Sequence, residues 1–103
     1  MSYYAYTPIT DDPVVLDLTG CNDLGDLHQR IRKTFGFPGY YGENWDAMWD
    51  CLTDVFLWES DRRAIHIKGY STMSNELQNY CQTMKEILFR LQQRFPEVII
   101  SYL

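Results

Sequence analysis

Three short runs of β-branched and apolar residues are typical of buried β-strands. They cover residues 14–18, between Pro13 and Gly20, residues 63–68, which end at Gly69, and residues 98–102, which follow Pro96. Proline and glycine at the ends of such runs mark turns. The pattern therefore predicts three strands spread over the whole chain.

Apolar residues spaced three and four apart predict a helix after the first strand and a second one before the next strand. The first begins at Asn22 or Asp23, the expected N-cap, and ends at Gly36. The second begins at Glu43 or Asn44. The recurring apolar positions of the first helix are Leu24, Leu27, Ile31 and Phe35. The second helix has an apolar side that we expect to pack inward, formed by Trp45, Met48, Cys51, Leu52 and Val55.

A third apolar stripe predicts one long helix with Ser74 as its N-cap. Its members are Leu77, Tyr80, Cys81, Met84, Ile87, Leu88, Leu91 and Phe95. Both connections between the strands then contain helices, which permits parallel pairing through right-handed crossovers. The predicted fold class is α/β, a small parallel three-stranded sheet packed with helices.

The chain of 103 residues has the length of one domain. We assign residues 13–103 to this domain and residues 1–12 to an N-terminal extension. The extension is rich in tyrosine (Tyr3, Tyr4 and Tyr6) and is an arm, an added strand or disordered.

The composition, 46% hydrophobic with a formal net charge of −5, indicates an acidic globular protein that repels nucleic acid and attracts basic surfaces. No apolar run approaches the length of a membrane span. The first residues do not resemble a secretory signal, which favours a cytoplasmic location. Cys21, Cys51 and Cys81 form no C-x-x-C pair, so we expect buried thiols rather than a disulfide framework or a zinc site. We expect no cofactor and no other metal.

The candidate functional surface is the acidic side of the second predicted helix. Asp46, Asp50 and Thr53 lie opposite its apolar stripe, and Asp54 extends the negative charge toward the helix end. Carboxylates at i and i+4 repel by roughly 0.2–0.5 kcal/mol, so local stability does not select this pattern. The plain alternative is an acidic face that is merely solvated.

Aromatic residues beside the acids favour a binding surface. Trp49 falls at the border between the apolar and the acidic sides, and Tyr40 comes from the preceding loop. Rigid aromatic anchors next to charged groups are typical of interface hot spots. For Tyr41 and Trp45 we favour packing in the core.

The segment from Tyr40 to Thr53, Tyr-Tyr-Gly-Glu-Asn-Trp-Asp-Ala-Met-Trp-Asp-Cys-Leu-Thr, resembles the signature of the barstar family, small intracellular inhibitors of secreted microbial ribonucleases. The resemblance continues upstream through Asp26-Leu-His-Gln29 and Phe37-Pro38. It weakens after Asp54 and is absent from roughly the first dozen residues. It implies a barstar-like fold and an inhibitor that is not an enzyme.

The resemblance also implies how such an inhibitor works. The loop and the second helix would plug the active site of a basic ribonuclease in a 1:1 complex, with the carboxylate of Asp50 in the place of the substrate phosphate. The expected partner-binding residues are Tyr40, Gly42, Asn44, Asp46, Trp49, Asp50, Thr53 and Asp54. The host's own secreted enzyme and a competitor's toxin nuclease, met by an immunity protein or antitoxin, both remain open as targets.

The sequence departs from the family pattern in two places. Asp54 stands where the pattern has glycine, and Val55 stands where it has an aromatic residue. The family's further acid on the last helix has no secure counterpart, because the register puts a residue such as Arg90 near it. We therefore carry over no contact from that helix.

Two other functions are compatible with parts of the sequence. A hydrolase could use Asp46 and Asp50 with His28 or His66, but structural roles are favoured for both histidines, and no phosphate loop or nucleophile elbow is present. A barstar-like adaptor could bind a partner other than a nuclease. The apolar residues 55–58 would then widen the interface, although core packing is the simpler interpretation.

Overall fold

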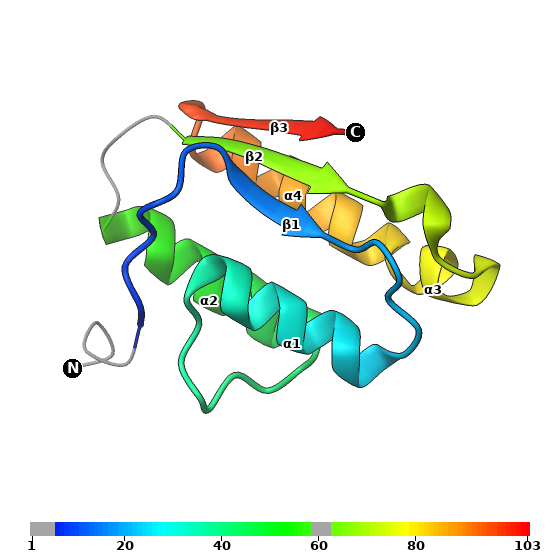
Figure 1. The fold of residues 1–103 in the computed structure, drawn as a ribbon. Coiled ribbons are helices and arrows are strands. Elements are labelled where there is room, and N and C mark those ends of the chain that lie inside the picture. The colour runs from blue at the N-terminus through cyan, green and yellow to red at the C-terminus, as the bar shows by residue number, and fades with distance from the viewer. Residues whose placement is uncertain (1–5, 59–62) are drawn as a thin grey trace.

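The computed structural model describes residues 6–58 and 63–103. It has the predicted α/β class, with helices packed on a small parallel sheet (Figure 1). In chain order the elements are β1 (Val14–Asp17), α1 (Leu24–Phe35), α2 (Trp45–Trp58), β2 (Arg63–Lys68), the 3-10 turn η2 (Tyr70–Thr72), α3 (Asn75–Tyr80), α4 (Gln82–Arg94) and β3 (Val98–Tyr102).

The three predicted strands pair in the order β1-β2-β3, and both pairs are parallel. Leu16 lies beside Ile67, and Ile65 lies between Val14 and Ile100. Burial alternates along the strands. Leu16, Ile65 and Ile67 point to one face of the sheet and are fully buried, whereas Val15 and Ile99 point to the other face and are 43% and 47% exposed. Helices therefore cover one face of the sheet and leave the other open.

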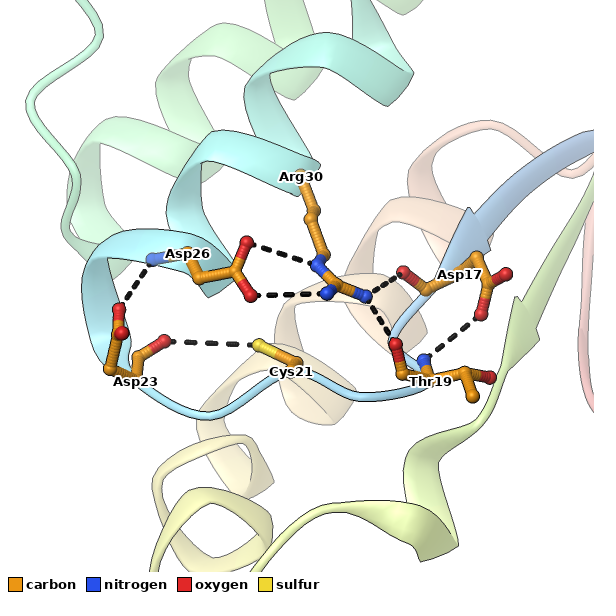
Figure 2. Close-up of polar contacts among 6 residues, drawn as sticks. All are labelled: Asp17, Thr19, Cys21, Asp23, Asp26 and Arg30. Carbon is orange, nitrogen blue, oxygen red and sulfur yellow. Dashed lines mark hydrogen bonds and ion pairs between the residues drawn. The ribbon is translucent and has the colours of Figure 1, made fainter.

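The first helix is held by the caps that its sequence predicts. Asp23 is the N-cap and its carboxylate accepts from the Asp26 N–H at 2.7 Å, while Gly36 adopts the left-handed conformation at the C-cap. Arg30 then ties α1 to the end of β1 (Figure 2). Its guanidinium pairs with Asp26 and donates to the carbonyl oxygens of Asp17 and Thr19, at 3.1 and 2.7 Å.

The prediction of one long helix from Ser74 was wrong in one respect, because the helix is divided at Cys81. Ser74 does cap α3, but Cys81 has ψ of −2° and α4 starts after it. The carbonyl oxygen of Gln78 accepts from the Tyr70 hydroxyl at 2.8 Å. The hydroxyl belongs to η2, which precedes α3 in the chain. It provides a hydrogen bond for a carbonyl oxygen near the end of α3, where the regular helical hydrogen bonds are interrupted.

Residues 6–12 pack against the domain. The Thr7 N–H donates to the Gly36 carbonyl oxygen at 2.8 Å, and Ile9 is buried. The Arg63 guanidinium donates to the carbonyl oxygens of Ile9 and Asp11 at 3.1 and 3.3 Å. Thr7 lies so close to Gly36 that a Cβ on residue 36 would overlap its carbonyl group, so this approach needs glycine. Tyr3 and Tyr4 lie outside the described residues.

The three cysteines are buried free thiols, as the sequence indicated. Burial raises the pKa of the Cys81 thiol to about 11. Within residues 6–58 and 63–103, no group of three His, Cys, Asp or Glu side chains is placed to hold a metal ion. No helix in these ranges is long and apolar enough to cross a membrane.

Candidate functional site

The start of α2 is fixed by the residues just before it. The side-chain oxygen of Asn44 accepts from the Ala47 N–H at 2.8 Å, and its amide nitrogen donates to the Gly42 carbonyl oxygen at 3.1 Å. Side-chain carbon on residue 42 would crowd Asn44 and Ala47. Gly42 and Asn44 therefore act within the chain as the cap of α2, whatever further contact they make.

The two sides of α2 differ sharply in burial. Met48, Cys51, Leu52 and Val55 are buried as predicted, and Phe56 joins them, while Trp45 is half-buried. Asp46 and Asp50 are exposed on the opposite side, with Thr53 half-buried beside them. The helix is thus anchored by one side and presents carboxylates on the other.

The exposed carboxylates have no cation of their own. Across the described residues the only ion pair within 4.0 Å joins Arg30 to Asp26, so Asp46 and Asp50 are left without one. The Thr53 hydroxyl donates to the carbonyl oxygens of Trp49 and Asp50, at 3.1 and 2.9 Å. Its oxygen remains able to accept a hydrogen bond. The face therefore presents carboxylate and hydroxyl oxygens that can accept further hydrogen bonds.

Trp49 forms the border of the acidic face toward α4. It is half-buried, and the guanidinium carbon of Arg90 lies 4.7 Å from the centre of its ring. About two turns further along α2, Phe56 faces Phe95 with ring centres 6.2 Å apart. The predicted position of Trp49 between core and solvent is confirmed, but an arginine from α4 stands over its ring.

The opposite border is formed by the N-terminal segment. The Tyr6 hydroxyl donates to the Asp54 carboxylate at 3.0 Å, and burial together with contacts to Cys51 and Asp54 raises the pKa of Tyr6. Figure 1 shows this segment (blue) beside the end of α2. Asp54, the charge that the family pattern does not contain, is therefore already hydrogen-bonded within the chain.

The loop before α2 rests on a buried histidine. His28 is only 2% exposed, and its ring nitrogens lie 2.7 Å from the Tyr41 hydroxyl and 2.8 Å from the Tyr80 hydroxyl. Its ring also packs on Trp45, with centres 5.0 Å apart. Tyr41 is buried as expected, whereas its neighbour Tyr40 is 65% exposed. The cluster thus holds the loop in place while Tyr40 projects to solvent.

Sequence reasoning placed Asp46 and Asp50 on the exposed side of α2 and Trp49 at its border, as the structure has them. It did not predict the contact of Arg90 with Trp49 or that of Tyr6 with Asp54. Tyr6 and Arg90 carry no local pattern that would assign them to the site. His28 is buried and hydrogen-bonded, in agreement with the structural role favoured for it. His66 lies in β2, the strand predicted to contain it, and is half-buried there. Of the apolar residues 55–58, Val55 and Phe56 are buried and Leu57 is 60% exposed, while the side chain of Trp58 lies outside those described.

Two comparisons with known proteins match this chain. The family model described as "Barstar (barnase inhibitor)" matches residues 12–99. A Bacillus subtilis (strain 168) protein named "Putative ribonuclease inhibitor YrdF" is 26% identical over 84 residues, covering 82% of this chain and 89% of that protein. The family match spans most of the chain and contains the whole of α2. The chain therefore belongs to the barstar family.

Proposed function

We propose that this member of the barstar family is a protein inhibitor that blocks the active site of a basic microbial ribonuclease with α2 and the loop before it. The observation that carries the proposal is the pair of exposed carboxylates, Asp46 and Asp50, which have no cation within 4.0 Å in the described part of the chain. The family description and the name of the Bacillus subtilis relative, each of which refers to inhibition, support it.

The chemistry of the target explains why carboxylates suit this role. A ribonuclease gathers cationic side chains around the scissile phosphate, and a carboxylate inserted there forms charge-assisted hydrogen bonds with the same groups. Because α2 is anchored by buried residues such as Met48 and Leu52, its acids are held in place before binding. Such preorganisation reduces the entropy lost on association. Inhibition then needs occupation of the site and no reaction.

The proposed contacts fall into three kinds. Asp46 and Asp50 supply charge at the centre. Tyr40 and Trp49 supply aromatic surface, and Thr53 supplies a hydroxyl oxygen. Gly42 and Asn44 present the start of the helix, and Asp54 contributes at the rim through the carboxylate that Tyr6 orients. We expect a monomer that forms a 1:1 complex, with self-protection in the cytoplasm or immunity to a toxin as its purpose.

The test is an inhibition assay against barnase and a panel of other secreted bacterial ribonucleases. Asp50→Ala should weaken the complex by about 2–5 kcal/mol, which corresponds to a rise of roughly 30-fold or more in the inhibition constant Ki. Asp46→Ala should act in the same direction. Both residues are exposed, so the melting temperature should stay close to that of the parent.

Glu97→Ala is the matched control, because it removes one negative charge from an exposed position just before β3. It should leave Ki within about threefold, since an exposed charge that is not among the proposed contacts acts mainly through the screened field. Inhibition by Asp50→Ala as tight as that of the parent would show that α2 is not the plug.

The position of His28 does not support the hydrolase alternative. His28 is buried between two tyrosine hydroxyls, away from solvent. Hydrolysis of RNA by the pure protein that disappears in Asp50→Asn would nevertheless reverse this ranking. The adaptor alternative would be favoured if a non-nuclease protein bound the parent and lost its affinity for Asp50→Ala.

A further inference from the structure

A positive charge stands at the edge of the acidic face. Arg90 is exposed on α4, and its guanidinium lies over the ring of Trp49 on α2. No carboxylate approaches it within 4.0 Å among the residues that the structure describes. Among the described residues its charge therefore has no carboxylate partner, and its N–H groups can donate to a partner protein.

The position of Trp49 brings this charge to the proposed contact surface. Trp49 directly precedes Asp50, and with about 3.6 residues per turn its side chain lies on the α4 side of the acids. A protein that covers Trp49 and Asp50 also meets Arg90. Arg90 is thus a positive charge at one edge of the surface formed by Asp46 and Asp50, which otherwise attracts cations.

Local stability is a weak explanation for this arrangement. An exposed cation over an indole ring contributes roughly 0.5–1 kcal/mol, and a neutral side chain could cover the ring as well. Against that gain, the charge of Arg90 repels the basic site that Asp46 and Asp50 attract. The arrangement is compatible with tight binding where the partner places an acidic group opposite Arg90.

We infer that Arg90 is a specificity-determining residue, which selects a ribonuclease whose basic active site carries an acidic side chain at the rim facing α4. Enzymes with lysine or arginine at that rim are rejected, because a like charge in an interface is costly. This inference rests on the proposed function, since it concerns the border of the same surface.

The experiment compares Arg90→Glu, Arg90→Gln and Arg90→Lys with the parent against the same ribonuclease panel, barnase included. For the enzyme that the parent inhibits best, Arg90→Glu should raise Ki by about tenfold or more, and Arg90→Gln by less. Arg90→Lys keeps the charge and should remain within about threefold, which separates recognition of charge from the packing of the planar guanidinium on Trp49.

Lys68→Glu is the matched control, because it changes the net charge equally from the exposed end of β2. It should leave Ki within about threefold. Substituting lysine for the acidic rim residue of the enzyme should restore its inhibition by Arg90→Glu. Enzymes that the parent rejects should be inhibited better by Arg90→Glu.

The results for Asp50→Ala and Arg90→Glu distinguish failure of the specificity role of Arg90 from failure of the proposed inhibitor function. If Asp50→Ala abolishes inhibition while Arg90→Glu moves Ki no more than Lys68→Glu does, the specificity role is overturned and the inhibitor role stands. Tighter inhibition of the best-bound enzyme by Arg90→Glu also overturns it, since that rim would then be basic. If Asp50→Ala inhibits as well as the parent, or nothing in the panel is inhibited, the proposed function fails and this inference fails with it.

Discussion

Lowering the pH from about 7.5 to about 5.5 should destabilise the fold, because His28 is buried in its neutral form. A neutral imidazole has one donor and one acceptor nitrogen, so one tyrosine hydroxyl can donate to the ring and the other can accept from it. Burial lowers the pKa of His28 below its ordinary value of 6.5, although the nearby Glu43 opposes this effect. Protonation therefore favours the unfolded chain.

The size of the effect follows from the one proton involved. The unfolded state binds it near pH 6.5, whereas the folded state does not until a lower pH. The stabilising contribution is thus complete above the unfolded pKa and is lost as the pH falls through and below it. One proton sets the upper bound on the loss between about pH 7.5 and pH 5.5, which is about 1.4 kcal/mol for a folded ring that stays neutral throughout this window.

The assay is urea unfolding of the parent and two variants at several pH values in this window. His28→Gln keeps polar atoms at the site without a titrating ring, so its free energy of unfolding should be lower but should lose this dependence on pH. His66→Gln removes the other histidine and should keep the dependence. A parent whose stability is flat across the window, or a His28→Gln variant with an unchanged slope, would refute the assignment.

Two further substitutions test the packing on either side of α2. Tyr6→Phe should lower the free energy of unfolding by about 1 kcal/mol through loss of the hydrogen bond to Asp54, while Tyr40→Phe, whose ring is largely exposed, should leave it unchanged in the same urea titration. Met48→Asp should abolish the cooperative thermal transition, because it buries a charge at a cost comparable with the whole stability of such a domain. Leu57→Asp, at an exposed position on the same helix, should still fold.

The elements that the sequence predicted correctly are those with local causes. Asp23 and Gly36 bound α1 because a cap acts within one turn of the helix, and the buried side of α2 follows from spacing alone. The division at Cys81 has no such cause. The apolar spacing continues in phase across it without glycine or proline, and the Tyr70 hydroxyl that serves the Gln78 carbonyl comes from η2.

The candidate site likewise contains features with local causes and features that depend on distant segments. The separation of acids from apolar residues on α2 is a property of one helix, so Asp46 and Asp50 could be found from their spacing. The partners of Trp49 and Asp54 come from distant segments, α4 and residues 6–12, and no local pattern predicts Arg90 over an indole or Tyr6 on a carboxylate. Only the packing of these segments on α2 brings them together.

In the proposed function, the centre of α2 and its two borders contribute differently to recognition. Conserving the charged centre of α2 preserves attraction to any basic phosphate-binding site, which is a property shared by many ribonucleases. The two borders of this centre differ in chemistry. On the α4 side lies the cation of Arg90, and on the other side the Tyr6 hydroxyl donates to the Asp54 carboxylate. Changes at Asp50 should therefore decide whether a nuclease is bound, and changes at Arg90 should decide which one.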